Sequence, residues 1–227
     1  MKNFINLSDI DKKDLRKIID QAKKQKLEKN SINKFQSLIG KTLIMIFEIP
    51  STRTRISFEL AMKKLGGYSI VLNPKESHYG SGNESIYDTA KVLSQYGDII
   101  MMRSEKHDNF LEFSNHLDIP IINGLTNLSH PCQIMSDIAT FEELKGPIEN
   151  KKIAWLGDGN NVVYSLIEAS VQFNFQLTIA CPQKLRPNKK IMKWAKNKKA
   201  KILITEDPKE AANLADCIMT DKWISMV

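Results

Sequence analysis

Short apolar runs with strand character alternate with amphipathic helical runs along almost the whole chain, and this alternation restricts the folds that it can adopt. The strand-like runs are Thr42–Phe47, Tyr68–Leu72, Asp98–Met102, Ile119–Ile122, Lys152–Leu156, Gln176–Ala180, Lys201–Ile204 and Cys217–Thr220. The helical runs are Ser8–Glu28, Arg53–Leu65, Glu84–Tyr96, His107–Asn115, Pro131–Leu144, Asn160–Phe173, Asn188–Lys199 and Pro208–Leu214. Strands that alternate with helices usually form a mostly parallel sheet with helices on both faces. We therefore expect an α/β fold.

One short segment, Lys145–Asn150, interrupts the alternation and contains a Gly-Pro pair that is typical of a loop. The chain has 227 residues, which is enough for one large domain or two modest ones. We predict two domains, residues 1–146 and 151–227, each with a mostly parallel sheet flanked by helices.

The turn after the first strand-like run is rich in hydroxyls and guanidiniums. Ser51, Thr52 and Thr54 are interleaved with Arg53 and Arg55 where a helix is expected to begin. A helix N-terminus offers unpaired N–H groups and a positive dipole end, which favour an anion, and Arg adds fork-shaped donors that suit phosphate. Ser at this position is often only a helix cap, but Arg there opposes the dipole. The turn therefore predicts a site for a small dianion.

Three further polar residues follow or lie near strand-like runs, at the edge where open α/β sheets place ligands. These are Arg103, His130 and Asp221. From the residues alone the alternatives stay open, because an Arg after a strand is often a surface residue and an Asp often belongs to a turn. A His before Pro131, a favoured first helical residue, could simply cap or pack the helix start.

The segment Gly157–Val162 follows a strand-like run and opens a helix, as a dinucleotide-binding G-x-G-x-x-G motif does. Its last position is Val162 instead of Gly, and the next strand ends at Cys181-Pro182 without an acidic residue to bind a ribose hydroxyl. We therefore do not expect a nucleotide cofactor.

Three segments, in the same order along the chain, resemble the motifs of the aspartate/ornithine carbamoyltransferase family. Ser51–Glu59 resembles the carbamoyl-phosphate motif S-T-R-T-R-x-S-F-E, His130–Gln133 resembles H-P-x-Q, and Asp221–Met226 resembles the D-x-W-x-S-M segment of the ornithine branch. The resemblance implies transfer of a carbamoyl group from carbamoyl phosphate to the δ-amine of L-ornithine, giving citrulline and phosphate in arginine metabolism. It implies neither a cofactor nor a metal.

The resemblance also implies a role for individual residues. The residues implied to bind carbamoyl phosphate are Ser51, Thr52, Arg53, Thr54, His78, Arg103, His130 and Gln133, of which Thr54, Arg103 and His130 donate to the reacting carbonyl oxygen. The residues implied to bind ornithine are Asn161, Asp221, Ser225 and Met226. His78 would act in the site of a neighbouring subunit, which implies a homotrimer or a multiple of one.

Two alternatives to ornithine transfer remain. The amine could be aspartate, putrescine or acetylornithine, although aspartate would require cations where Asp221 stands. Members of the family that the chain resembles continue well beyond the segment that ends at Met226, so the resemblance implies a C-terminal truncation and an incomplete second domain. The chain could then be an inactive phosphate-binding fragment.

Charge, hydropathy and cysteine content argue against a nucleic-acid-binding protein and against a membrane protein. The net charge of +7 comes largely from Lys-rich helical runs without interleaved aromatics, which favours a solvated surface over nucleic-acid binding. No run of about 18 apolar residues is present, so we expect no membrane span. The three cysteines, Cys132, Cys181 and Cys217, have neither metal-site nor disulfide spacing, and together with the polar start of the chain they favour the cytoplasm.

Overall fold

The computed structural model describes residues 3–27, 36–74 and 78–221, and the chain forms two compact units. The first unit comprises Met1–Ile5 and Lys24–Asn127, and the second comprises Asn6–Lys23 and Leu128–Val227. These units are defined by contacts, whereas the predicted domains, 1–146 and 151–227, are defined by the ligand that each would bind. The division into ligand-binding domains therefore stays a prediction.

Four parallel strands form the sheet of the first unit. They are β1 (Thr42–Phe47), β2 (Tyr68–Leu72), β3 (Ile99–Arg103) and β4 (Ile121–Leu125), in the order β2-β1-β3-β4. Because all four strands run in one direction, the residues that follow β1 and β3 meet at the same edge of the sheet. The predicted parallel α/β architecture is confirmed in this unit.

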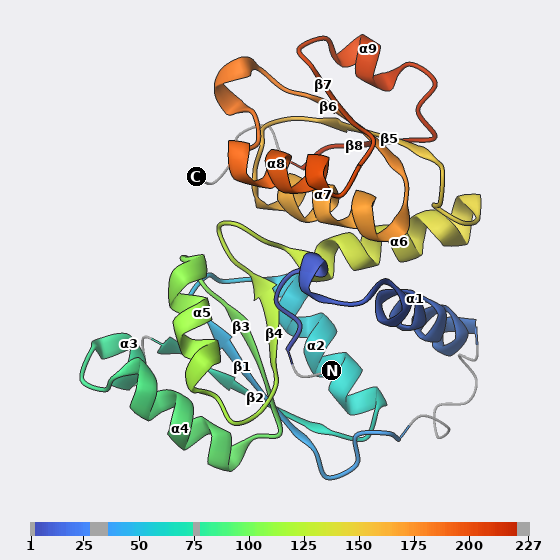
Figure 1. Ribbon diagram of the computed structural model, residues 1–227. Coiled ribbons are helices and arrows are strands. Elements are labelled where there is room, and N and C mark those ends of the chain that lie inside the picture. Colours follow the sequence, from blue (N-terminus) through green and yellow to red (C-terminus); the bar gives the residue numbers. More distant parts are fainter. Residues whose placement is uncertain (1–2, 28–35, 75–77, 222–227) are drawn as a thin grey trace. The chain divides into compact units, whose positions relative to one another are not determined.

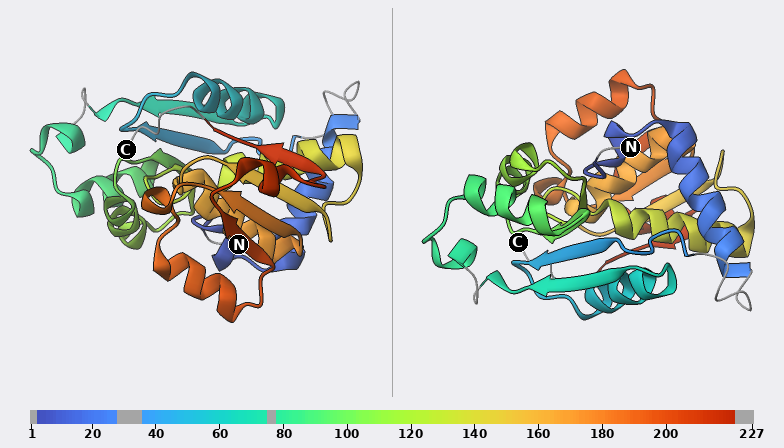
Figure 2. Two further views of the ribbon diagram at one scale, coloured as in Figure 1. Left: turned by 90° about the horizontal axis from the view of Figure 1, so that it is seen from above. Right: turned by 90° about the horizontal axis from the view of Figure 1, so that it is seen from below.

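Helices cover both faces of this sheet. Figures 1 and 2 show α2 (Thr52–Lys64) on one face and α4 (Ile86–Tyr96) with α5 (His107–His116) on the other. Successive side chains of a strand point to opposite faces, so each strand contributes to two apolar layers. The layer beneath α2 contains Leu43, Met45, Met62 and Met101, and the layer beneath α5 contains Ile44, Ile46, Ile100, Met102, Phe110 and Phe113.

The second unit has a parallel sheet of the same size. Its strands are β5 (Lys152–Leu156), β6 (Gln176–Ala180), β7 (Ile202–Thr205) and β8 (Cys217–Met219), in the order β7-β6-β5-β8. Figure 1 shows α9 (Pro208–Ala212) on one face, and α7 (Asn161–Phe173) with α8 (Lys189–Asn197) on the other. The side chain of Trp155 in β5 is buried in this core.

The remaining helical elements of the described chain range from single turns to long helices. They are η1 (Leu7–Asp9), α1 (Lys12–Leu27), α3 (His78–Ser81), α6 (Pro131–Lys145) and η3 (Gln183–Leu185). The four strands β1, β2, β5 and β6 have the predicted bounds, whereas α3 lies between the predicted runs Tyr68–Leu72 and Glu84–Tyr96, where no helix was expected. Within the described ranges, no helix combines the length and the apolar character that a membrane crossing requires.

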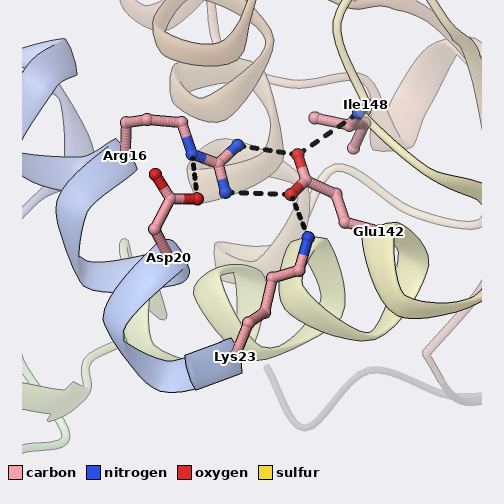
Figure 3. A network of polar contacts seen from close by, with 5 residues as sticks. All are labelled: Arg16, Asp20, Lys23, Glu142 and Ile148. Atoms are coloured by element: carbon pink, nitrogen blue, oxygen red, sulfur yellow. Dashed lines mark hydrogen bonds and ion pairs between the residues drawn. The ribbon is translucent and has the colours of Figure 1, made fainter. Parts of the chain in front are cut away.

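An ion-pair network joins α1 to α6 within the second unit (Figure 3). The Arg16 guanidinium donates to both carboxylate oxygens of Glu142, at 2.7 and 2.9 Å, and the Lys23 ammonium lies 3.4 Å from the same carboxylate. The Glu142 side chain is only 3% exposed, and it also accepts from the Ile148 N–H at 3.3 Å. Burial alone would raise the pKa of Glu142, but the hydrogen bonds and charge of Arg16 outweigh it and hold that pKa below the usual range.

A second buried carboxylate, Glu168 of α7, holds the N-terminal segment. It accepts hydrogen bonds from the Leu7 N–H at 3.0 Å, the Ser8 N–H at 3.4 Å and the Ser8 hydroxyl at 3.1 Å. Burial raises the pKa of Glu168 from 4.5 to about 7, although the bonds from Ser8 and Leu7 act in the opposite direction and the charge of Asp9 raises it further.

We expect this carboxyl group to make the protein less stable as the pH rises from about 5 to 8. A carboxyl group whose pKa is raised by folding binds its proton more tightly in the folded state, so the stability that it contributes is present at low pH and is lost as the group ionises. The shift of the Glu168 pKa to about 7 corresponds to a loss of up to about 3 kcal/mol. Urea denaturation of the wild type and of Glu168→Gln at both pH values measures the effect. An equal pH dependence in the two proteins would contradict it.

Candidate active site

The turn between β1 and α2 forms a hydrogen-bonded cluster with the end of β3. Ser51 is the N-cap of α2, where its Oγ accepts from the Thr54 N–H at 3.2 Å and donates to Thr54 Oγ1 at 2.9 Å. The same Thr54 oxygen accepts from Arg103 Nη1 at 3.2 Å. Since both bonds use the lone pairs of this oxygen, its hydrogen can point to a third group. The structure thus brings Ser51, Thr54 and Arg103 together.

The remaining residues of the turn differ in their surroundings. Thr52 and Arg53 are exposed at the first positions of α2. The Arg55 guanidinium lies 3.0 Å from the Glu59 carboxylate one turn further along the helix. Ser51 is thus a helix cap, as one of its two interpretations holds. Of the two guanidiniums in the turn, that of Arg55 is paired with a carboxylate.

Arg103 is buried, so the alternative interpretation of this residue as an ordinary surface arginine is wrong. It is the last residue of β3 and is only 6% exposed. Its carbonyl accepts from the Glu48 N–H at 3.0 Å, which fixes the end of β3 against the residue after β1. A buried guanidinium at the carboxyl edge of the sheet can donate to a ligand oxygen without a large loss of side-chain freedom.

Sequence reasoning missed Glu48, which organises the same edge of the sheet. Its carboxylate accepts from the Tyr79 hydroxyl at 2.6 Å, the Ser104 hydroxyl at 2.7 Å and the Glu105 N–H at 3.0 Å. Burial, followed by the hydrogen bond to Glu48, raises the pKa of Tyr79 above its usual range. The signal that could have revealed Glu48 was a carboxylate directly between a buried strand and the hydroxyl-rich turn.

The predicted residue His78 begins α3 and is exposed to solvent. It belongs to the first unit, as does the Ser51–Thr54–Arg103 cluster. The hydroxyls of its neighbour Tyr79 and of Ser104, which follows β3, both donate to the Glu48 carboxylate. Glu48 therefore ties α3 to the end of β3.

His130 and Gln133 lie at the start of α6 in the second unit. His130 is the half-buried N-cap residue, and its backbone N–H donates to the Ser165 hydroxyl of α7 at 2.9 Å. Gln133 is exposed, and its Nε2 donates to the Asp137 carboxylate at 2.8 Å. Burial raises the pKa of Asp137, and the bond from Gln133 lowers it in part.

Asn160 connects two of the residues predicted to bind the amine substrate. Its Oδ1 caps α7 by accepting from two backbone N–H groups, at 3.0 and 3.1 Å, and its Nδ2 donates to the Asp221 carboxylate at 3.3 Å. Asn161 is the first residue of α7 and is half-buried, while Asp221 is exposed. Sequence reasoning chose Asn161 and missed the bridging role of its neighbour. The predicted residues Ser225 and Met226 lie outside the described residues.

Gly159 of the Gly157–Val162 segment packs closely against another part of the backbone. In dinucleotide sites the second glycine lets the pyrophosphate approach the backbone. Here a Cβ at Gly159 would lie 2.4 Å from the Pro187 nitrogen, and the Gly159 N–H donates to the Leu185 carbonyl at 2.7 Å. The backbone of residues 185–187 therefore occupies the volume beside Gly159.

Comparison with known proteins agrees with this geometry. Residues 2–143 match the family model "Aspartate/ornithine carbamoyltransferase, carbamoyl-P binding domain", and residues 149–227 match "Aspartate/ornithine carbamoyltransferase, Asp/Orn binding domain". The ornithine carbamoyltransferase of Agrobacterium fabrum is 47% identical over 225 residues, which are 99% of this chain and 73% of that protein.

Solved structures show the same relationship. The ornithine carbamoyltransferase of Pyrococcus furiosus superposes with a TM-score of 0.93 at 39% identity, over 99% of this chain and 73% of that one. The anabolic ornithine carbamoyltransferase of Campylobacter jejuni gives a TM-score of 0.92 at 35% identity, over 100% and 75% of the two chains. The two α/β units match a carbamoyl-P binding domain and an Asp/Orn binding domain, which places the chain among the carbamoyltransferases. The chain belongs to the aspartate/ornithine carbamoyltransferase family.

Proposed function

We propose that this protein transfers the carbamoyl group of carbamoyl phosphate to the δ-amine of L-ornithine, which gives citrulline and phosphate. The hydrogen-bonded cluster of Ser51, Thr54 and Arg103 at the N-terminus of α2 is the observation that carries the proposal. The relatives named ornithine carbamoyltransferase support the choice of ornithine as the amine.

The start of α2 is suited to the phosphate half of the first substrate. The first N–H groups of a helix lack intrahelical partners and lie at its positive dipole end, so they attract a dianion. The exposed Arg53 supplies a guanidinium, and Thr52 supplies a hydroxyl on the same turn. We assign phosphate binding to Ser51, Thr52, Arg53 and Thr54.

The reaction needs positioning and charge stabilisation by the protein. The neutral amine of ornithine attacks the carbamoyl carbon, a C–N bond forms, and the carbonyl oxygen becomes an oxyanion. The bond from carbon to the phosphate oxygen then breaks, and the departing phosphate takes the proton that the amine loses. We assign Thr54, Arg103 and His130 as donors to the oxyanion, and Gln133 as a contact of the carbamoyl amide, because preorganised donors are effective at such a centre.

For ornithine we assign Asn161 and Asp221, with Ser225 and Met226 as predicted further contacts. A carboxylate at position 221 can hold an ammonium group by charge and hydrogen bond, and it would repel the carboxylate of an aspartate substrate. The Asn160 bridge at 3.3 Å supports the assignment because it ties Asp221 to the start of the helix that carries Asn161.

The proposal also covers the oligomeric state, the metabolic pathway and the cellular compartment. If His78 contacts the phosphate in a neighbouring subunit, the protein must form a homotrimer or a multiple of one. We place the reaction in arginine biosynthesis in the cytoplasm, and the anabolic enzyme of Campylobacter jejuni, a similar structure, supports the biosynthetic direction.

A product assay with a panel of amines tests the function. The protein is incubated with carbamoyl phosphate and ornithine, acetylornithine, putrescine or aspartate, and the ureido product is measured. We expect the highest kcat/KM with ornithine. A higher value with another amine would overturn the substrate assignment, and calorimetric binding of carbamoyl phosphate without any turnover would identify a phosphate-binding protein instead of an enzyme.

Arg53→Ala is expected to raise the KM for carbamoyl phosphate about 10- to 100-fold, because a hydrogen bond to a charged group contributes about 1.5–3 kcal/mol. The matched control is Arg55→Ala on the same turn, since that guanidinium is paired with Glu59 at 3.0 Å. Steady-state kinetics with saturating ornithine give both constants. The same KM in the wild type and in Arg53→Ala would exclude Arg53 from the phosphate site.

A further inference from the structure

Ser165 lies on α7, one helical turn after Asn161, and its side chain is completely buried. Residues four apart in a helix share a face. On that face the Ser165 hydroxyl accepts the backbone N–H of His130 at 2.9 Å and lies 3.3 Å from the Ser129 hydroxyl. The hydroxyl of one helix therefore fixes the residue at which another helix begins.

The contact adds a hydrogen bond at the start of α6, where the helix has no side-chain cap of its own. The first N–H groups of a helix have no partner within the helix, and the His130 side chain makes no capping hydrogen bond to α6. Ser165 provides the acceptor from outside. The Ser129 hydroxyl also contacts the Ser165 hydroxyl, and Ser129 is only 2% exposed. Ser165 therefore contacts two successive residues, Ser129 and His130, where the chain enters α6.

The same helix is tied to the residues assigned to the amine. The N-cap Asn160 donates to Asp221 at 3.3 Å, and Asn161 opens α7. A continuous set of contacts thus runs from Asp221 through the first turn of α7 to Ser165 and His130, and all of these residues belong to the second unit. The backbone of His130 is thus tied to the helix that carries Asn161.

We propose that Ser165 is a positioning residue for carbamoyl transfer, which holds His130 in register with Asn161 through its hydrogen bond to the His130 backbone. The proposal rests on the proposed function. Ser165 touches neither substrate, so its removal should affect the placement of the donor more than the binding of carbamoyl phosphate. A misplacement of about 1 Å in a catalytic group can lower the rate about 100-fold.

The test compares Ser165→Ala with Ser170→Ala. Ser170 is on the same helix and is 3% exposed, but its hydroxyl donates to the Ile167 carbonyl at 2.7 Å, within α7. We expect kcat to fall about 10- to 100-fold in Ser165→Ala, with the KM for carbamoyl phosphate changed less than about 2-fold. Ser170→Ala should keep the wild-type kcat, and Ser165→Thr, which retains the hydroxyl, should recover most of the lost rate.

Amide hydrogen exchange provides a second measurement that does not depend on turnover. The His130 amide should exchange faster in Ser165→Ala than in the wild type or in Ser170→Ala. If kcat is equal in the two alanine variants, or if the His130 amide is unaffected, the positioning role is wrong while the proposed function stands. If the wild type forms no citrulline from carbamoyl phosphate and ornithine, the proposed function fails and the positioning role fails with it.

Discussion

Replacement of Arg103 by alanine is expected to lower kcat for citrulline formation by about 100- to 1,000-fold, the usual effect of removing one preorganised oxyanion donor. Arg103 is buried at the end of β3 and donates to Thr54 Oγ1 at 3.2 Å. The substitution would remove the guanidinium and also the hydrogen bond that Arg103 donates to the Thr54 hydroxyl oxygen.

Arg103→Met separates charge from packing, because methionine retains an apolar stem of similar length. We expect Arg103→Met to lose nearly as much activity as the alanine variant while unfolding at nearly the same urea concentration as the wild type. A double-mutant cycle with Thr54→Val should be non-additive, since the two side chains share a hydrogen bond. A wild-type kcat in Arg103→Met would remove Arg103 from the catalytic assignment.

Glu142→Ala is expected to lower the free energy of unfolding of the second unit by about 2–3 kcal/mol, because it removes hydrogen bonds between charged groups from a buried carboxylate. The Arg16 guanidinium, which lies 2.7 Å from this carboxylate, would keep only Asp20 as a partner, and the Lys23 ammonium and the Ile148 N–H would lose this acceptor. Urea denaturation followed by tryptophan fluorescence measures the loss. Trp155 and Trp194 both belong to the second unit.

Two variants serve as controls for Glu142→Ala. Asp20 also pairs with Arg16, at 3.0 Å, but its side chain is 62% exposed, so Asp20→Ala should cost at most about 1 kcal/mol. Joint replacement of Arg16 by methionine and Glu142 by leucine should recover much of the stability, because no buried charge is left unpaired. Equal losses in Glu142→Ala and Asp20→Ala would show that burial of the pair contributes nothing.

The pH dependence of this network has the opposite sign to that of Glu168. The pKa of Glu142 is held below its usual value of 4.5, so the stability that it contributes is present above that pH and is lost as the pH falls through the lowered pKa.

Much of the fold could be predicted because the strands carry strong local patterns. The bounds of β1, β2, β5 and β6 follow from apolar, β-branched runs that are closed by turn residues. The prediction Ile119–Ile122 differs from β4, which begins two residues later and continues through Gly124 to Leu125. A Cβ at Gly124 would lie 2.5 Å from the Met101 sulfur, so glycine is needed there for the close approach of β3 and β4.

The candidate site could be predicted where its residues are adjacent in sequence or, like Arg103, directly follow a strand-like run. The turn at Ser51–Thr54 is visible as a local cluster of hydroxyls and guanidiniums. The roles of Glu48, Asn160 and Ser165 depend on partners 56, 61 and 35 residues away, at Ser104, Asp221 and His130. No periodicity or motif relates such distant positions, so these roles emerge only when the chain is folded.

The filled space beside Gly159 limits how this scaffold could be put to other uses. A strand, a glycine-rich turn and a helix start are the parts from which many α/β proteins build a nucleotide pocket. In this chain the main chain at Leu185–Pro187 lies directly against Gly159. Point substitutions cannot vacate main-chain atoms, so conversion to a nucleotide-dependent enzyme would require deletion or rerouting of a whole loop.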